Sequence, residues 1–589
     1  MKKDFYINLQ AEEQDQLAAC EKTAGHYTLY RTICFFALIF AFAAAYDGLS
    51  IAGIMGVLLL VLFGWLIRQH NHIKKQIRFF QNALAVTADY LSHFDKTWQD
   101  LPDKGEDLCK ASRPQDVDLH IFGKASLYQY LCCARTALGR KELARALNIM
   151  PPPPADILKH QEAAAELIGR QRLCVELLAL SRQLPAGHDT VPLLKEITTD
   201  RQQDISHTLQ RTSWILPILT LCSIILAAAD LLSWQLPGLL VLLQFTIAMI
   251  FQQQNHAILT PLLALNQELH AYQTLFIRLR ETNFTSTVLT RLAADLSQNG
   301  APALQKLARL TDHVNLCRNL FFYVLGNALF LWDCHCAARF ARWQDDAAQN
   351  LPDWLQEWAE MELYLSLAMV GHTREQYCFP QILRGDPQLK ATTLAALLLD
   401  ETKAVPNDTT LASETRIITG SNMSGKTTYM RTLASSLVLA YAGAPVCAKA
   451  FACTPMHIFT SIQVHDDQSQ GISTFYAELL RIKQMVDFSQ KELPMFICID
   501  EIFKGTNSAD RIIGAREAIS RLTQPYAITL VSTHDFELCD LQSPNNIPVT
   551  NYHFAEYYEE NKIKFDYKIK NGRCQTTNAQ YLLKMAGIL

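Results

Sequence analysis

Four uncharged, apolar segments stand out from an otherwise mixed pattern of hydrophobic and polar positions. They form two pairs, at residues 32–46 with 48–67 and at residues 212–229 with 231–251. Asp47 and Asp230 separate the members of each pair. A helix needs about 20 apolar residues to cross a membrane, and a buried helix of a water-soluble domain usually keeps a polar stripe, which these segments lack. The pattern predicts two transmembrane helical hairpins, 28–68 and 212–253, in which the first segment is short unless residues 27–30 join it.

Lysine and arginine lie outside the apolar pairs and not in the turns within them. They lie before the first segment, after the second and before the third: Lys2, Lys3, Lys22, Arg31, Arg68, Lys74, Lys75, Arg78, Arg201 and Arg211. Both connecting turns lack them, so the positive-inside rule predicts a multi-pass protein of an inner or plasma membrane with both turns outside. A cleaved signal peptide fits poorly, because a second apolar segment follows the first at once. The basic run 68–78 could also contact DNA or lipid headgroups, but topology alone explains its position.

The remaining N-terminal residues have the pattern of amphipathic helices. Residues 69–211 and 254–370 carry apolar positions at i, i+3, i+4 and i+7, which predicts an all-α domain in two parts. Residues 1–27 are expected to form a cytoplasmic segment, and the prolines at 151–154 a rigid break between helices. The apolar stretch 320–332 is too short to span a membrane, so we expect a helix of the domain core.

From about Tyr377 the pattern changes to short β-rich runs that alternate with helices. This alternation predicts a C-terminal α/β domain with a largely parallel sheet over residues 371–589. Near the end, residues 549–557 and 562–569 are expected to form a hairpin.

Composition narrows the class of protein. The 589 residues allow about three or four domains, and 49% apolar with 19% charged residues argues against a disordered chain. A net charge of −4 disfavours a strongly basic nucleic-acid binder, although a local basic surface stays open. The 16 cysteines are scattered without a C-x-x-C pair, which favours reduced, buried thiols in a reducing compartment over zinc sites.

One motif carries phosphate chemistry. The sequence GSNMSGKT at 420–427 satisfies G-x-x-x-x-G-K-[ST], after an apolar strand and before a helix. In such a loop the backbone N–H groups wrap the phosphates of ATP, Lys426 reaches the β- and γ-phosphates, and the Thr427 hydroxyl ligates Mg²⁺. The candidate nucleotide-binding residues are Gly420, Ser421, Asn422, Met423, Ser424, Gly425, Lys426, Thr427 and Thr428.

Two later strands end in further candidate catalytic groups. The apolar run 496–499 is followed by Asp500 and Glu501. Asp500 is expected to hold Mg²⁺, and Glu501 to act as the general base toward the attacking water. A third strand ends before His534, which could hydrogen-bond the γ-phosphate or that water.

These motifs together resemble the ATPase domain of the MutS mismatch-repair family. The matching segments are TGSNMSGKTT at 419–428, DEIFKGT at 500–506, THDFEL at 533–538, and Ser473, Thr474, Phe475 and Glu478 after the acidic pair 466–467. The resemblance covers about the last 200 residues. More weakly, residues 118–147 look like the start of the helical core and lever domain of that family.

The resemblance implies an ABC-type P-loop ATPase that works as a homodimer, with an all-α core/lever domain at 69–211 and 254–370. Ser473 would then reach the γ-phosphate bound by the other subunit, so that ATP completes the dimer interface. Mismatch recognition is not expected, because membrane segments occupy much of the chain before residue 116, where the family carries its recognition domain. The only F-x-E string begins at Phe554 in an expected strand, and DNA binding is left open.

Two other interpretations remain. The chain could be half of an ABC-type transporter, but its apolar segments have few polar groups to line a pathway, no LSGGQ string occurs, and the interval from Gly425 to Gly471 is short. It could also be a membrane scaffold that binds nucleotide without hydrolysis. Lys426 together with the acidic pair and His534 favours hydrolysis.

Overall fold

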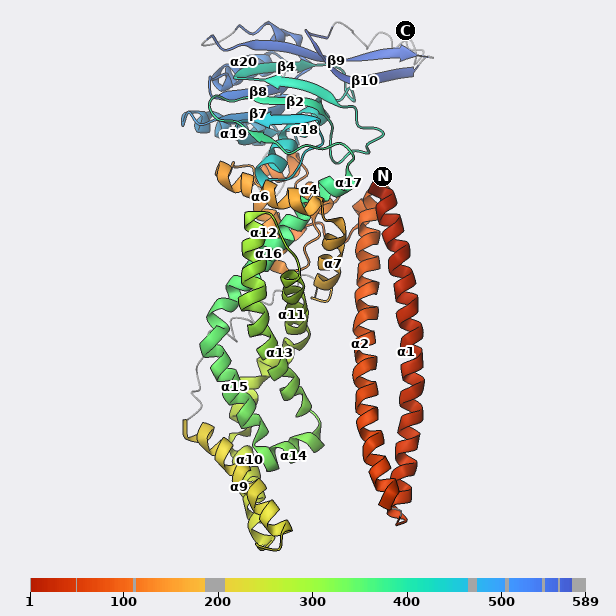
Figure 1. Cartoon of the computed structure of the whole chain (residues 1–589). Helices are drawn as coiled ribbons and strands as arrows, with labels where there is room; N and C mark the ends of the chain where they lie inside the picture. The colour runs from red at the N-terminus through yellow and green to blue at the C-terminus, as the bar shows by residue number, and fades with distance from the viewer. Residues whose placement is uncertain are drawn as a thin grey trace.

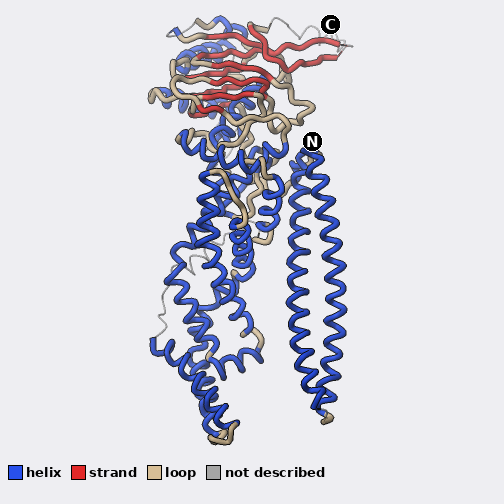
Figure 2. The backbone as a smooth tube through the Cα atoms, viewed as in Figure 1, coloured by secondary structure: helices blue, strands red, loops and turns tan. Residues whose placement is uncertain are grey.

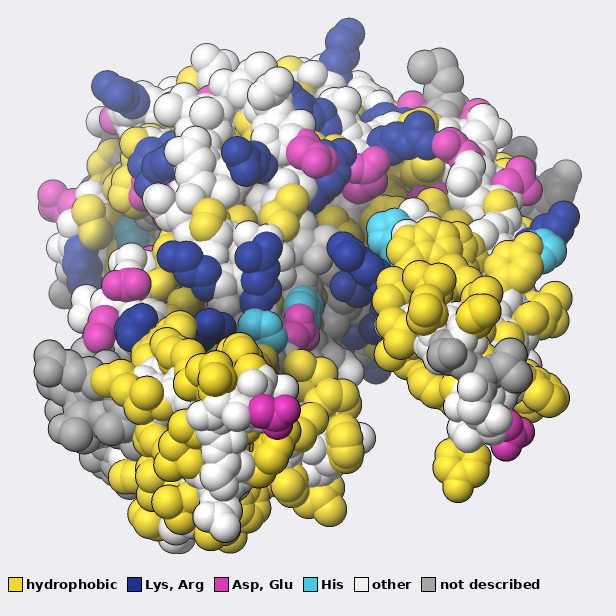
Figure 3. All heavy atoms as spheres, turned by 60° about the horizontal axis from the view of Figure 1, so that its bottom comes forward, with side chains coloured by type: hydrophobic (Ala, Val, Ile, Leu, Met, Phe, Trp, Pro, Cys, Tyr) yellow, Lys and Arg dark blue, Asp and Glu magenta, His cyan; other side chains and the backbone are white. Residues whose placement is uncertain are grey.

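The computed structural model describes residues 2–48, 50–109, 113–185, 207–463, 474–503, 508–542, 546–559 and 562–574. The molecule is elongated, with all strands gathered at one end and long helices running away from them (Figures 1 and 2). The apolar helical ends lie at the opposite end, where hydrophobic side chains cover two separate protrusions (Figure 3). The surface of the molecule therefore becomes apolar along its long axis, toward the end opposite the strands.

Helices α1 (Lys2–Tyr46) and α2 (Ser50–Phe94) form one long antiparallel hairpin. Each has 45 residues, so both continue well beyond the apolar segments, and α1 runs without a break through position 27. At the polar end of the hairpin Tyr6 stacks on Tyr90 at 4.6 Å, and the Thr87 hydroxyl donates to Glu13 at 2.9 Å. This end of the hairpin is held together by buried contacts, whereas the apolar end exposes its side chains.

A second hairpin is formed by α9 (His207–Ala228) and α10 (Gln235–Ala264). Among the described residues, three helices are long and apolar enough to cross a membrane by length and composition: α1, α2 and α10. The third predicted segment forms a shorter apolar helix, Ser213–Ala228 within α9. Pro217 lies inside this helix, and Asp230 turns the chain with a φ of 57°.

The helical core lies between the second hairpin and the strands. Its helices are α3 (Pro114–Asp118), α4 (Leu127–Leu131), α5 (Ala137–Ala146), α6 (Pro154–Ile168), α7 (Gln171–Ser181), α11 (Asn266–Arg280), α12 (Thr287–Asp295), α13 (Ala301–Leu316), α15 (Trp332–Ala347), α16 (Leu351–Leu367) and α17 (Met369–Thr373). Short helical turns are η1 (Trp98–Asp100), η2 (Glu106–Leu108), η3 (Leu296–Gly300) and η4 (Ala348–Asn350). The apolar faces of these helices, including the fully buried Trp358, form one continuous core that extends into the strand domain.

The expectation of a core helix at 320–332 is wrong. The stretch forms α14 (Leu320–Phe330), which exposes Leu320, Phe321 and Phe322 by 76%, 69% and 51% and buries only Asn327. The chain bends by 81° between α14 and the helices that follow. The short helix therefore lies across the end of the core beside α10 (Figure 1), where no core covers it.

The C-terminal domain is α/β, as predicted. Its larger sheet has the order β10-β9-β4-β8-β7-β6, in which β4, β6, β7, β8 and β9 run parallel and β10 pairs antiparallel with β9. These strands are β4 (Glu414–Thr419), β6 (His457–Ser461), β7 (Met495–Asp500), β8 (Ala527–Ser532), β9 (Val549–Glu559) and β10 (Lys562–Asn571). The hairpin expected near the end of the chain is thus confirmed.

A smaller sheet was not anticipated. It has the order β1-β5-β2-β3, from β1 (Gln381–Ile382), β2 (Leu389–Leu394), β3 (Asn407–Leu411) and β5 (Ala450–Cys453). Helices α18 (Lys426–Ala442), α19 (Thr474–Ser489) and α20 (Ser508–Leu522), with the turn η5 (Phe536–Asp540), complete the domain.

Candidate functional site

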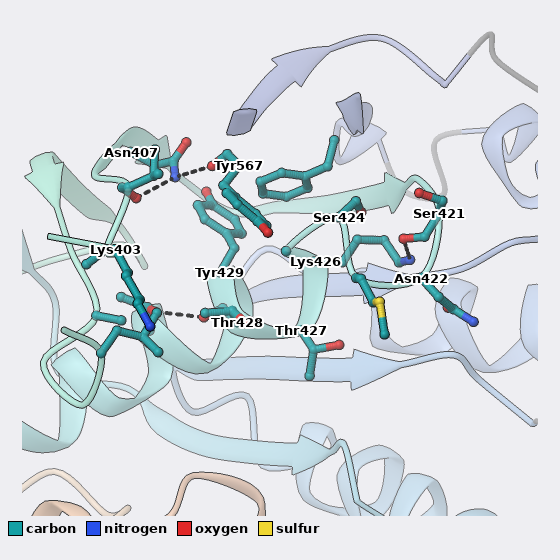
Figure 4. Close-up of a pocket in the computed structure, with 18 of the residues that line it drawn as sticks. Lys403, Asn407, Ser421, Asn422, Ser424, Lys426, Thr427, Thr428, Tyr429 and Tyr567 are labelled. Carbon is teal, nitrogen blue, oxygen red and sulfur yellow. Dashed lines mark hydrogen bonds between the residues drawn. The ribbon is translucent and has the colours of Figure 1, made fainter. Parts of the chain in front are cut away.

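The glycine-rich loop joins the buried strand β4 to α18, which begins at Lys426. Gly420 and Gly425 take φ angles of 143° and 109°, which L side chains rarely adopt. A Cβ on Gly420 would lie 2.8 Å from the carbonyl oxygen of Phe554, so β9 presses directly against the loop. The loop borders a cavity of about 580 Å³ that the nucleotide-binding candidates Ser421 to Thr428 line (Figure 4).

The side chains of the loop point into a polar cradle. The buried Lys426 ammonium donates to the carbonyl oxygen of Gly420 at 2.8 Å. It also donates to the carbonyl oxygen of Ser421 at 3.0 Å (Figure 4). Ser424 Oγ is buried and has no hydrogen-bond partner among the described residues. Met423, in contrast, is 86% exposed at the edge of the same cavity. A cradle with a lysine, open glycine backbone and an unpartnered hydroxyl fits a phosphate chain.

The strand order brings the first acidic candidate to this loop. Because β4, β8 and β7 are parallel neighbours, their carboxyl ends meet at one edge of the sheet. Asp500 at the end of β7 accepts a hydrogen bond from the Thr427 hydroxyl at 2.7 Å and another from the Ser532 hydroxyl. A hydroxyl and a carboxylate in contact are oxygen ligands of the kind that Mg²⁺ prefers. The residues present therefore fit the predicted metal position.

Glu501 points away from its neighbour Asp500. Its φ of 51° is left-handed, an uncommon conformation for a residue other than glycine. The turned backbone brings the Glu501 carboxylate to 3.2 Å from His534 Nε2, which lies 2.9 Å from Asn422 Oδ1. His534 and Glu501 remain partly exposed, by 43% and 25% of their side chains. The pair faces solvent beside the loop, as a base that must reach a water molecule would.

Two supporting contacts near the loop were not predicted from the sequence. Glu478 on α19 is buried and accepts a hydrogen bond from the backbone N–H of Phe503 at 2.7 Å, which fixes the turn after Glu501. Asp535 holds Arg511 through two hydrogen bonds of 2.9 and 2.7 Å, next to His534. Both acids lie in the sequence motifs that resemble the MutS ATPase domain. Their place near the site was therefore predictable, but the residues that they contact were not.

The F-x-E string belongs to the wall of this cavity. Phe554 on β9 is buried against the two loop glycines, and Glu556 accepts a hydrogen bond from the Ser421 hydroxyl. Tyr567 on β10 lines the same cavity, and its carbonyl oxygen accepts from Asn407 at 3.0 Å. The string supports the loop here. The sequence does not indicate that this string contacts the glycine-rich loop, because the two are brought together only by the pairing of β9 with β4.

Not every candidate can be described. Ser473 lies outside the described residues, as do the pair Asp466 and Asp467 and the segment 504–507. Among the residues that the structure describes, no group of three or more His, Cys, Asp or Glu side chains could hold a metal ion. The candidates that can be described, from Gly420 to Thr428 with Asp500, Glu501 and His534, lie around the loop at one edge of the sheet.

The fold and site define a multidomain chain with a helical N-terminal region and a C-terminal α/β domain that carries a glycine-rich loop. Residues 416–588 match the family MutS domain V. The chain is 30% identical over 253 residues to the DNA mismatch repair protein MutS of Natronomonas pharaonis, covering 41% of this chain and 28% of that relative. It is 28% identical over 281 residues to the DNA mismatch repair protein MutS 2 of Haloarcula marismortui, covering 44% and 29%.

The C-terminal domain of the chain is therefore similar to domain V of the MutS family. The matches span less than a third of the length of these curated relatives. The matched residues, 416–588, include the glycine-rich loop, the strand that ends in Asp500, and His534.

Proposed function

We propose that this protein is a membrane-anchored ATPase of the MutS family, which binds and hydrolyses ATP with Mg²⁺. One observation carries the proposal: the carboxyl ends of three parallel strands gather Lys426, Asp500 and His534 around a single loop. An adenine nucleotide needs a cavity beside that loop, and one of about 580 Å³ is present.

Each residue then has a defined task. Lys426 exchanges its two carbonyl partners for the β- and γ-phosphates, and the loop N–H groups and the start of α18 stabilise their charge. Thr427 and Asp500 would hold Mg²⁺, which would neutralise charge on the phosphates. Glu501 accepts a proton from the attacking water. His534 and Asn422 orient both the Glu501 carboxylate and the γ-phosphate.

The membrane part of the proposal rests on the exposed apolar ends of the two hairpins. Apolar side chains such as Phe40, Ile51 and Leu242 are exposed by 74%, 75% and 62%. Soluble proteins rarely expose apolar patches of this extent, whereas a lipid bilayer covers them. With the lysine and arginine asymmetry, this supports a multi-pass protein with the ATPase domain on the cytoplasmic side.

The working unit in this proposal is a homodimer. Ser473 would contact the γ-phosphate bound by the partner, so ATP would couple its own hydrolysis to a change of the dimer. DNA binding remains open for this chain, and mismatch recognition is not part of the proposal.

The test separates nucleotide binding from hydrolysis in the purified full chain. Glu501→Gln should keep ATP affinity within about threefold and lower turnover roughly 10²–10⁴-fold, because only the base is lost. Lys426→Ala should weaken binding itself. Glu517→Gln, at an exposed acid of α20 that pairs with Arg521, is the matched control and should leave both unchanged. Unchanged turnover in Glu501→Gln would refute the assigned base, and binding without turnover in the unmodified chain would favour the scaffold.

A further inference from the structure

Four basic side chains face one hollow of the helical core. Lys306 and Arg309 on α13, with Arg339 and Arg342 on α15, line a space of about 690 Å³. All four are exposed, and none has an ion-pair or hydrogen-bond partner for its side chain among the described residues. The only acid in the lining is Asp346. The four cations outnumber this acid, so the hollow carries a net positive charge, which attracts an anion.

An apolar hollow adjoins the basic one. Its volume is about 300 Å³, and its lining includes Trp214, Pro217, Ile218 and Leu221 of α9 with Phe330 and Trp332. His313 and Arg339 line both hollows, so the two adjoin at these side chains. Ring contacts of Trp214 with His335 at 4.7 Å and of His313 with Trp332 at 5.6 Å build the rim.

The joined hollows lie where the polar core meets the apolar protrusions. Ile218 and Leu221 are exposed by 59% and 53% on the hairpin that continues into the apolar end. Seen from that end, lysine and arginine side chains form a band directly behind the hydrophobic protrusions (Figure 3). A bilayer around the protrusions would bring its headgroups to the level of this band.

We propose that the joined hollows bind one anionic phospholipid of the membrane. The lipid phosphate contacts Arg309, Arg339 and Arg342, whose planar guanidinium groups suit phosphate oxygens, with Lys306 adding charge. An acyl chain lies against the apolar wall from α9 and Trp332. Trp214 and Trp332 occupy the interface level that tryptophan favours. The inference rests on the proposed membrane anchoring and extends it to a specific lipid.

The apolar wall distinguishes a lipid from other anions. A free phosphate would use the basic half and leave the apolar half without a ligand. Duplex DNA would contact the exposed cations, but its phosphates cannot enter the apolar space beside them. Only an amphiphile uses both halves.

The experiment measures lipid retention by native mass spectrometry. The full chain is purified in mild detergent and mixed with phosphatidylglycerol or phosphatidylcholine of identical acyl chains. We expect about tenfold preferential retention of one phosphatidylglycerol, lost in the Arg309→Gln/Arg342→Gln double variant and kept in Arg309→Lys/Arg342→Lys. The matched control, Arg280→Gln/Arg318→Gln, removes the same charge at exposed positions that line neither hollow and should retain the lipid.

Four results would overturn the inference. Equal retention of both lipids, or full retention by the glutamine variant, would exclude a specific anionic site. Displacement of the lipid by soluble glycerol 3-phosphate at similar concentration would show a free-phosphate site, and displacement by duplex DNA a nucleic-acid site. Extraction from membranes and ATP turnover are measured on the same preparation, so a failed lipid site is distinguished from failed anchoring or failed hydrolysis.

Discussion

The two neighbouring acids at the end of β7 differ in direction because of one backbone angle. Asp500 continues the strand and accepts from Thr427, whereas Glu501, with φ at 51°, turns toward His534. A left-handed residue that is not glycine costs about 1–2 kcal/mol, which the surrounding contacts must offset. Glu478 supplies one such contact through the N–H of Phe503. A single backbone angle thus separates the proposed metal ligand from the proposed base.

Gly425 offers a test of the loop at the same scale. Gly425→Ala places a Cβ at a φ of 109° and 3.2 Å from Tyr567, so the loop must shift. We expect ATP affinity to fall at least about tenfold, since 1.4 kcal/mol of strain corresponds to that factor. Equilibrium titration with a fluorescent ATP analogue measures it. Gly572→Ala is the control, because its φ of 87° imposes strain while a Cβ there meets nothing within 4 Å. Equal losses in both variants would contradict a local role of Gly425.

At the scale of elements, one aspartate joins the helical core to the α/β domain. Asp118 ends α3 and is fully buried. It accepts hydrogen bonds from Thr460 at 2.6 Å and the N–H of Gln463 at 2.9 Å, and it pairs with Arg481 of α19 at 3.1 Å. These contacts lie on both sides of the segment that contains Ser473. A movement of the helical core would therefore be transmitted to both ends of that segment.

Asp118→Asn tests this connection. Loss of the charge leaves Arg481 unpaired in a site where breaking a buried pair costs about 3–5 kcal/mol. We expect backbone amides of β6 and α19 to exchange with deuterium at least about tenfold faster than in the unmodified chain. Asp116→Asn is the matched control, because Asp116 is equally buried but pairs with Arg113 beside it. Identical hydrogen-exchange rates in the two variants would contradict the proposed connection through Asp118.

The polar end of the α1–α2 hairpin has a pH-sensitive contact. Burial lowers the pKa of His372 on α17 from 6.5 to about 4. Its ring nitrogens lie 3.3 Å from the Tyr90 hydroxyl and 3.2 Å from the Leu167 carbonyl oxygen. The folded state favours the neutral ring, so its stabilisation is complete above the ordinary pKa and is lost as the pH falls from 6.5 toward 4.

Hydrogen exchange at α17 and the adjoining end of α2 should follow this titration. Between about pH 7.5 and about pH 5 we expect the local opening free energy to fall by roughly 2 kcal/mol. His372→Gln keeps a donor for Leu167 but cannot gain a proton, so its opening free energy should change little over that range. A variant with the same pH dependence as the unmodified chain would assign the effect to another group.

Much of this organisation was accessible from sequence, for identifiable reasons. Short apolar runs that end in polar motifs predict parallel strands, so β4, β7 and β8 and the gathering of their carboxyl ends could be anticipated. The smaller sheet could not, because its strands are only two to six residues long and carry few large apolar side chains, although their burial alternates. Helix α14 was misassigned because hydrophobicity does not reveal whether a neighbour covers the helix. The contacts of Asp118 depend on residues more than 300 positions away.

At the scale of the whole molecule, both apolar protrusions point to the end opposite the strands (Figure 1). One membrane plane can therefore hold both hairpins while the α/β domain stays in water. Two chains held in one plane meet at a raised effective concentration, which favours the proposed dimer.

Mixing two inactive variants tests whether sites are shared between chains. Lys426→Ala damages the loop of its own chain, and Ser473→Arg damages the contact that a chain would make to its partner's nucleotide. In a mixed dimer of shared sites, one site carries both lesions and the other neither, so activity should return to about half of the unmodified level per mixed dimer. Crosslinking first establishes that mixed dimers form. No recovery in those dimers would restrict each site to one chain.

The central claim, an ATPase integral to a membrane, is tested most directly by Mg²⁺-dependent phosphate release from carbonate-washed membranes. Carbonate removes peripheral proteins and leaves spanning ones in place. Membranes carrying the unmodified chain should release phosphate after neutralisation, and those carrying Glu501→Gln at equal amount should release at least about 10²-fold less. Recovery of the intact chain in the carbonate supernatant, or equal release from both membranes, would contradict the account.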